Sequence, residues 1–205
     1  MIEDKIENIY TKKVVIKNAF WLYLGFLLNK LLKIIIILLS ARILGPENYG
    51  AFNYALSFLG IFFIISDWGI NSLLIRDYQQ TKEGEEIIKQ AFTVKSLLIS
   101  LCVILSILGY FILDNEKAKS VYFILLIMQV LNSFRDFLNS LFKAIQKMEY
   151  ESIAVSMESI VILMIVVILL VKVPSIINLG FAYLLGTLIS LLFLIFIAIK
   201  LHFIR

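Results

Sequence analysis

The sequence predicts an all-α polytopic membrane protein, a bundle of six transmembrane helices. Of the 205 residues, 61% are hydrophobic and only 17% are charged, and the mean hydropathy is +0.96. Ordinary globular domains are about 45–50% apolar and about 25% charged, so this chain has too little polar surface for a water-soluble fold. The apolar residues also gather in long stretches, which is typical of membrane-spanning segments.

Six stretches are long enough to cross a bilayer, because a spanning helix needs about 20 predominantly apolar residues. They are 18–42, 50–67, 87–113, 120–142, 153–173 and 177–201. Strands of a membrane barrel would alternate apolar and polar residues, and uninterrupted runs such as 34–39 do not. Helices are therefore expected, because in lipid the backbone must satisfy its own hydrogen bonds.

The segments between these spans are short and polar, and both prolines, Pro46 and Pro174, fall in them. No second, soluble domain is expected. We expect an N-terminal segment at 1–17, the six-helix bundle over 18–201 and a tail at 202–205. Segment 1–17 mixes acidic and basic residues and has no cleavage site after a short apolar region, so it does not read as a cleaved signal peptide.

The distribution of basic residues predicts the orientation of the chain. If the N-terminus is inside, eleven Lys and Arg residues fall in cytoplasmic segments. The segments outside then hold four, which are Arg42, Lys117, Lys119 and Lys172. Cytoplasmic loops carry an excess of Lys and Arg, so both termini are expected in the cytoplasm, with the protein in the cell membrane.

Polar residues inside the spans carry the functional signal. Lys30 and Lys33 lie three residues apart in the first span, and Asn29 lies four residues before Lys33, so one helix face is expected to hold them. A charge that faces lipid at that depth costs roughly 2.5–3.5 kcal/mol, so these lysines are expected to face protein or water. In the fourth span, polar residues recur at three- and four-residue intervals, and these are Asn132, Arg135, Asp136, Asn139 and Lys143.

The simplest assembly places the first and fourth spans around a hydrated cavity with a cationic wall. Such a wall suits an anionic ligand, and lipid-linked pyrophosphates are the obvious candidates. The candidate substrate-binding residues are Asn29, Lys30, Lys33, Asn132, Arg135 and Asn139.

A structural interpretation stands beside this one. In it, Lys30, Lys33 and Arg135 pair with acidic residues of other spans and hold the bundle together. The candidate acidic partners are Asp67, Asp136 and Glu158. Lys95 lies shallow in the third span and is expected to extend its ammonium to the cytoplasmic surface.

The sequence offers no catalytic, metal or nucleotide site. His202 is the single histidine, Cys102 is the single cysteine, and no G-x-x-x-x-G-K-[ST] loop occurs. No enzyme activity, cofactor or metal is therefore expected. The net charge of +4 does not indicate a nucleic-acid partner, because the basic residues are scattered between apolar runs.

The segment that follows the first span carries a recognisable motif. Residues 42–50 read Arg-Ile-Leu-Gly-Pro-Glu-Asn-Tyr-Gly. This resembles the R-x-L-G-P-x-x-Y-G loop of the Wzx-type oligosaccharide flippases, also called polysaccharide biosynthesis proteins, of the multidrug/oligosaccharidyl-lipid/polysaccharide exporter superfamily. Residues 67–70 and 74–76 match the end of that family's second helix and the arginine after it.

The resemblance implies a two-lobed bundle that opens alternately to either side of the membrane and moves lipid-linked sugar diphosphates to the outer leaflet. In that fold Gly45 and Pro46 would set the turn after the first helix, and cationic residues of the cavity would hold the diphosphate. This chain resembles only the N-terminal lobe, so a second half-transporter or a second copy is expected to complete the pathway. The expected partners are the lipid-linked sugar diphosphate and membrane lipids.

Two alternative functions remain open at this stage. One is a cation- or drug-exporting transporter of a sister branch, which would need an acidic cavity. The other is a non-transporting membrane subunit of a polysaccharide-synthesis complex.

Overall fold

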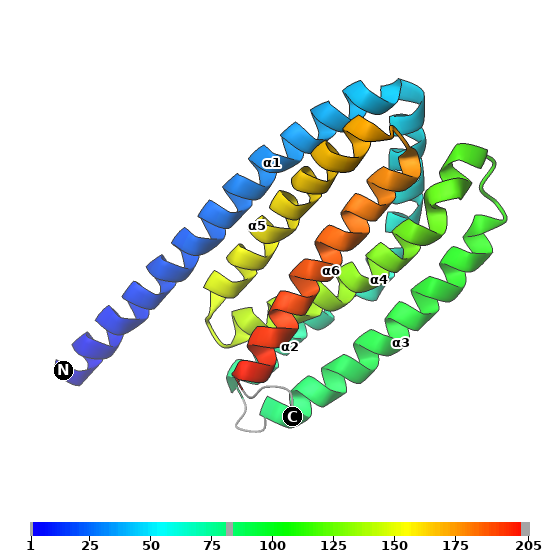
Figure 1. The fold of residues 1–205 in the computed structure, drawn as a ribbon. Helices are drawn as coiled ribbons and strands as arrows, with labels where there is room; N and C mark the ends of the chain where they lie inside the picture. The colour runs from blue at the N-terminus through cyan, green and yellow to red at the C-terminus, as the bar shows by residue number, and fades with distance from the viewer. Residues whose placement is uncertain (1, 81–83, 202–205) are drawn as a thin grey trace.

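The computed structural model describes residues 2–80 and 84–201, with side chains from residue 13 onward (Figure 1). This part of the chain is helical and contains no strand, which confirms the predicted fold class. The elements are α1 (Ile2–Phe63), η1 (Ile64–Ser66), α2 (Ile70–Gln80), α3 (Gly84–Tyr110), α4 (Glu116–Ala144), α5 (Met148–Ile165), η2 (Val166–Leu170) and α6 (Ile176–Lys200). The predicted tail at 202–205 lies outside the described residues.

Five helices of the described chain are long and apolar enough to cross a membrane. The six predicted stretches fall in these five, because the first two belong to α1. The backbone of α1 is not helical at Gly45, where φ is 76° and ψ is 165°. At this point the ribbon reverses its direction (Figure 1), so α1 consists of two arms joined by a sharp kink.

The kink follows from the Gly-Pro pair. A positive φ is costly for residues with a Cβ, and a proline disfavours the helical conformation in the residue before it. The side-chain amide of Asn48 donates a hydrogen bond of 3.1 Å to the carbonyl of Leu44, which is one of the carbonyls that the interrupted helix leaves without a partner. The predicted turn at Gly45 and Pro46 is confirmed.

Side-chain caps and a second glycine set other helix ends. The Asn115 side chain accepts a hydrogen bond of 3.0 Å from the amide of Ala118 and begins α4. The Ser175 hydroxyl accepts one of 3.2 Å from the amide of Ile177 and begins α6. Gly69, with φ of 81°, lies in the turn between η1 and α2. Short polar residues at these positions satisfy amides that the first turn of a helix leaves unpaired.

Helix α4 is the centre of the bundle, because it packs against α1, α2, α3, α5 and α6. Two apolar clusters surround it. The first includes Phe52, Leu59 and Tyr122 and reaches Met128 of α4. The second includes Phe137, Phe142 and Leu194. Asn132, Arg135 and Asp136 of α4 lie between the two clusters.

The glycines of α6 allow close helix packing. A Cβ atom at Gly180 would collide with Val121, and one at Gly186 would collide with Ile162. Small residues at such contacts let two helix backbones approach each other.

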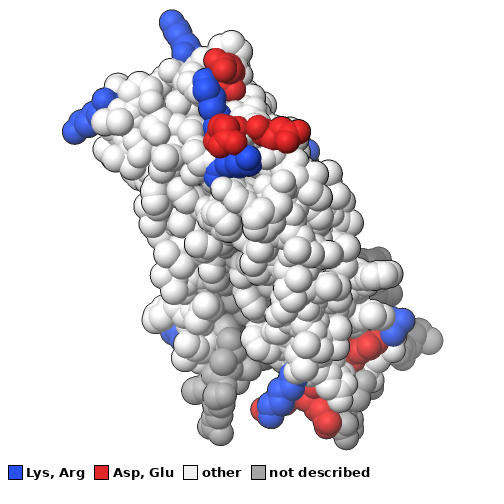
Figure 2. Space-filling view, turned by 90° about the vertical axis from the view of Figure 1, so that its right-hand side faces the viewer, with Lys and Arg blue, Asp and Glu red and all other residues white. Residues whose placement is uncertain are grey.

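The outer surface is largely apolar between two charged ends. Large hydrophobic side chains such as Leu38, Leu97 and Phe196 are more than half exposed. Figure 2 shows Lys, Arg, Asp and Glu gathered at the two ends of one face, with uncharged residues between them. This distribution matches a bilayer and its two aqueous sides, so the chain is a multi-pass membrane protein.

We predict that Gly45→Ala destabilises the fold by about 1–3 kcal/mol, because alanine would be forced into a backbone conformation that essentially only glycine adopts. Gly50 provides a matched control, because it is helical, has φ outside the positive range and has open space where a Cβ would lie. Thermal unfolding in detergent should show a lower midpoint for Gly45→Ala than for Gly50→Ala. Equal midpoints would contradict the assigned role of Gly45.

Candidate functional site

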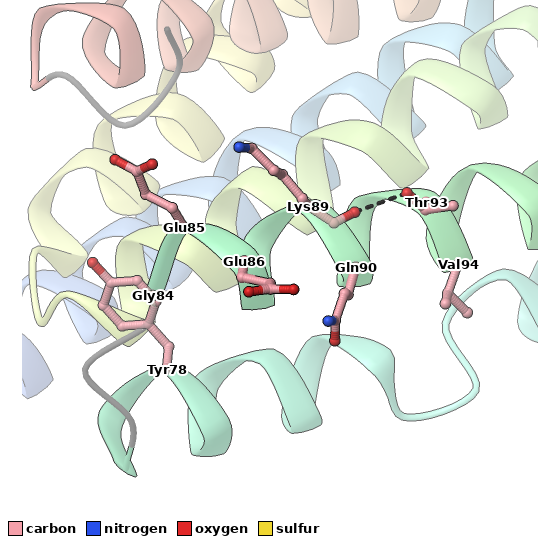
Figure 3. A pocket seen from close by; sticks show the side chains of 8 residues that line it. All are labelled: Tyr78, Gly84, Glu85, Glu86, Lys89, Gln90, Thr93 and Val94. Atoms are coloured by element: carbon pink, nitrogen blue, oxygen red, sulfur yellow. Dashed lines mark hydrogen bonds between the residues drawn. The ribbon is translucent and has the colours of Figure 1, made fainter.

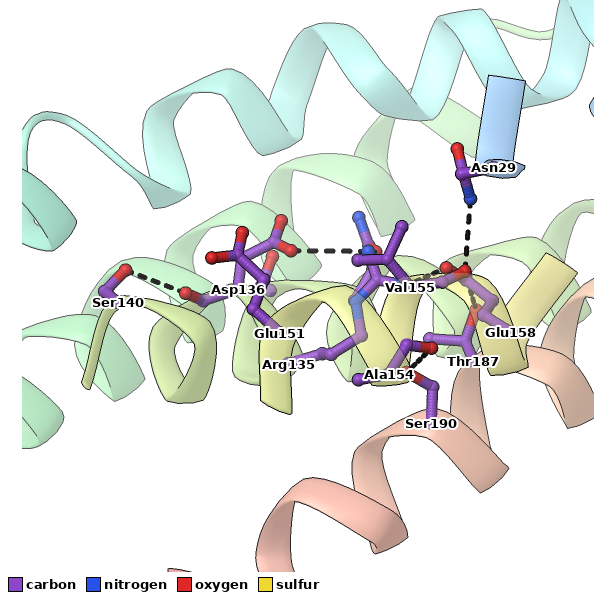
Figure 4. A network of polar contacts seen from close by, with 12 residues as sticks. Asn29, Arg135, Asp136, Ser140, Glu151, Ala154, Val155, Glu158, Thr187 and Ser190 are labelled. Atoms are coloured by element: carbon purple, nitrogen blue, oxygen red, sulfur yellow. Dashed lines mark hydrogen bonds and ion pairs between the residues drawn. The ribbon is translucent and has the colours of Figure 1, made fainter. Parts of the chain in front are cut away.

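The polar stripe of α4 faces a complementary acidic stripe on α5. Glu151 and Glu158 lie seven residues apart, about two helical turns, and so share one face of α5. Lys143 Nζ lies 2.9 Å from Glu151 Oε1, and the guanidinium of Arg135 forms an ion pair with the carboxylate of Glu158. The two pairs join α4 to α5 at two levels, and Figure 4 shows Arg135, Glu151 and Glu158 at this contact.

Arg135 is the most heavily paired of the predicted site residues. It is 9% exposed, and besides Glu158 it contacts Asp136 Oδ1 at 3.3 Å and donates a hydrogen bond to the side chain of Asn132. Glu158 also accepts a hydrogen bond of 3.0 Å from the Thr187 hydroxyl of α6. These partners fit the structural interpretation of Arg135, in which it binds acidic residues of its own bundle.

Asn29 extends the polar contacts to the first arm of α1. Its side-chain amide donates to the hydroxyl of Ser159 and, at 3.2 Å, to the carbonyl of Val155 (Figure 4). Asn29 is therefore buried against α5. We use the term polar layer for the connected set that runs through α1, α5, α6 and α4: Asn29, Ser159, Glu158, Thr187, Arg135, Asn132 and Asp136.

Lys95 of α3 lies at the other end of this layer. Its side chain is 1% exposed, and Nζ lies 3.9 Å from Asp67 Oδ1 in the turn after η1. The expectation that Lys95 reaches the cytoplasmic surface is wrong, because α1, η1 and α4 enclose the side chain. Lys95, Asp67 and Asp136 line a cavity of about 230 Å³.

Lys30 and Lys33 have a different environment. Both are exposed on the outer side of the first arm of α1, and neither forms an ion pair with any residue that the structure describes. They do not share the buried face of Asn29, although the sequence spacing placed all three together. The cavity also differs from the one expected between the first and fourth spans. It lies between α4 and the second arm of α1, and neither lysine lines it.

The structure thus brings part of the predicted site together. Asn132 and Arg135 are in direct contact, and Asn139 is buried on the same helix with a side-chain oxygen that has no partner among the described residues. Two acidic residues of α5 complete these contacts: Glu158, a partner of Arg135 that the sequence offered as a candidate, and Glu151, a partner of Lys143 that the sequence did not offer. The two glutamates are seven residues apart, and Arg135 and Lys143 are eight residues apart, so the acidic and basic pairs have nearly the same spacing. This matched spacing is the feature of the sequence that could have identified the glutamates as partners.

Other surface features carry no comparable chemistry. A hollow between the ends of α2 and α3 is lined by exposed side chains such as Glu86, Lys89 and Gln90 (Figure 3). Over residues 2–80 and 84–201, no group of three His, Cys, Asp or Glu side chains is placed to hold a metal ion.

A family model described as polysaccharide biosynthesis protein matches residues 15–204, which cover all the spans and the whole polar layer. The chain belongs to the polysaccharide biosynthesis protein family. No curated protein and no solved structure matches the chain. In this polysaccharide biosynthesis protein, the polar layer therefore lies inside the membrane-spanning bundle that the family model covers.

We predict that Glu158→Leu destabilises the protein by about 3 kcal/mol, because removal of one partner leaves a buried arginine without its main counterion. The predicted loss of stability is at the low end of the range for breaking a buried ion pair, because Asp136 remains beside Arg135. The double variant Arg135→Met/Glu158→Leu should regain most of that loss, since it buries no unpaired charge. Thermal unfolding of the purified variants measures both effects, and a double variant less stable than Glu158→Leu would show that the pair is not the dominant contact.

Proposed function

We propose that this chain takes part in moving lipid-linked oligosaccharide precursors across the cell membrane by alternating access, with no covalent chemistry. Membership of the polysaccharide biosynthesis family supports this proposal. The observation that carries it is the pair Lys30 and Lys33, two exposed cations on a helix arm whose other exposed residues are mainly apolar.

The lysine pair favours an anionic ligand at membrane depth. A lysine at the bilayer centre costs roughly 2.5–3.5 kcal/mol, and within the described chain these two have no acidic partner to offset that cost. A diphosphate group carries several negative charges and acceptor oxygens, so one such group matches two neighbouring ammonium groups. In this proposal Lys30 and Lys33 contact the diphosphate, while Asn29, Asn132, Arg135 and Asn139 hold the helices that position them.

The same exposed face supports the proposal of a second half. Beside the lysines, the first arm of α1 exposes large apolar side chains such as Phe26, Leu31 and Ile34. A second half-transporter or a second copy of this chain would cover this face and enclose the ligand between two lobes.

We also propose that both termini are cytoplasmic. This agrees with the excess of basic residues in the segments on that side, and the start of α1 and the end of α6 lie at the same end of the bundle (Figure 1).

The alternatives have less support. A cation exporter needs acidic groups that attract its substrate, whereas Glu158 is paired with Arg135 and Asp67 lies 3.9 Å from the ammonium of Lys95, which repels a cation. A non-transporting subunit of a synthesis complex would not need cations at membrane depth. Recovery of a glycosyltransferase with the chain, without any bound lipid-linked sugar, would favour that function.

We predict that Lys30→Ala/Lys33→Ala lowers translocation at least tenfold, because two charge-assisted contacts to the diphosphate are lost. The measurement is the transfer of a fluorescent lipid-linked sugar diphosphate across proteoliposomes that contain the chain and its membrane partner. Lys30→Arg/Lys33→Arg keeps the charges and should retain most of the activity. Lys89→Ala, an exposed lysine of α3 outside the proposed site, is the matched control. Normal translocation by the double alanine variant would refute the assignment.

A further inference from the structure

A polar cavity lies beside the polar layer, which shares Asn132 and Asp136 with the lining of the cavity. It measures about 230 Å³ and is enclosed by the end of α1, η1, α2, α3 and α4. Among its lining residues, six carry charged or amide side chains: Asp67, Asn71, Lys95, Gln129, Asn132 and Asp136. Asp67 is more than half exposed, so the cavity opens to the outside of the bundle at the η1 turn.

Lys95 indicates what the cavity must contain. Its ammonium group has three N–H donors and is buried, with only 1% of the side chain exposed. Its ion-pair partner, Asp67 Oδ1, lies 3.9 Å away, which is beyond hydrogen-bonding distance. No residue in the described part of the chain accepts a hydrogen bond from it. Because a buried ammonium without hydrogen bonds is costly, its donors require acceptors within the cavity.

Other lining groups require donors. The side-chain oxygen of Asn71 is buried and has no partner among the described residues. The amide of Gln129 likewise makes no hydrogen bond to any described residue, and the carboxylates of Asp67 and Asp136 can only accept while they are ionised. A molecule that satisfies this lining must therefore donate and accept hydrogen bonds at several neighbouring positions.

The charges of the lining exclude ionic ligands. A phosphate in the cavity would face the carboxylates of Asp67 and Asp136, and a metal ion would face the ammonium of Lys95. Asp136 is also paired with Arg135 at 3.3 Å, so a metal ion would have to compete with the guanidinium for this carboxylate. A neutral molecule with several hydroxyl groups meets neither repulsion, because every hydroxyl both donates and accepts.

The size of the cavity agrees with one sugar ring. About 230 Å³ equals the liquid volume of roughly eight water molecules, which is enough for one pyranose with its hydroxyl groups. We propose that this cavity binds a single neutral pyranose, with Lys95 as donor, Asn71 and Asp67 as acceptors and Gln129 as both. This rests on the proposed function, in which the pyranose belongs to the glycan of the translocated lipid.

The experiment uses the full chain in a detergent without sugar, lauryldimethylamine oxide. Methyl α-pyranosides of glucose, galactose, mannose and N-acetylglucosamine are titrated, and saturation-transfer NMR reports binding. At least one of them should bind, and Gln129→Ala should weaken it about fivefold, the effect of one lost hydrogen bond. Gln90→Ala, the same substitution at the exposed hollow of Figure 3, should leave binding unchanged. Asn71→Ala serves as a second cavity variant if Gln129→Ala does not fold.

Three results would overturn the proposal: no binding by any pyranoside, equal binding by the Gln129 and Gln90 variants, or displacement of the pyranoside by inorganic pyrophosphate. The translocation assay of the lysine variants separates this proposal from the function. If translocation depends on Lys30 and Lys33 but no pyranoside binds, only the sugar site is refuted. If a pyranoside binds at the cavity but the lysine variants translocate normally, the sugar site is supported and the proposed role of the lysines is refuted.

Discussion

The pairing of buried charge inside an apolar bundle is the constraint on which the arrangement of these helices depends. An arginine removed from water needs a carboxylate and hydrogen bonds that replace its hydration. Arg135 obtains them from Glu158, Asp136 and Asn132. Lys143 and Glu151 repeat the pairing two turns away. A shift of α5 by one turn along α4 would break both pairs together, so the charges select one register where apolar packing alone would tolerate several.

The π-helical segment that follows α5 allows the Arg135–Glu158 ion pair and the apolar contacts beyond it to form together. Along α5 and the following η2, the buried positions Glu158, Ile162, Val166 and Leu170 recur every four residues. In an ideal α-helix, a spacing of four advances the side chain by about 40° at each step, so the last positions would turn away from the bundle. The π-helical segment η2 (Val166–Leu170) has a wider turn and returns these residues to the buried face. The ion pair near the middle of α5 and the apolar contacts at its outer end are thereby both kept.

The hydrophobic stretches and the turn at Gly45 could be predicted, because each depends on residues close together in sequence. The partners of Arg135 could be named only as candidates, since its choice between Asp67, Asp136 and Glu158 depends on which helices are neighbours. The burial of Lys95 could not be predicted from its position near the end of a span. That position allows the ammonium to reach water, and the side chain is buried because η1 and α4 pack around α3. Likewise, the four-residue spacing of Asn29 and Lys33 allowed a shared face, but α5 covers only Asn29.

The cations of this bundle are of two kinds: some are paired with carboxylates, and others have no acidic partner among the described residues. Arg135 and Lys143 have carboxylates at hand, so a ligand that approached them would have to displace a partner already in place and would gain little net attraction. Lys30 and Lys33 have no partner within the described chain, so an anion that reaches them gains the full interaction in a medium that screens charge weakly. An uncompensated charge at membrane depth costs free energy on insertion, and a bound anion would offset that cost. Paired charges thus join α4 to α5, and in the proposed function the anion binds to the first arm of α1, which the described residues leave open.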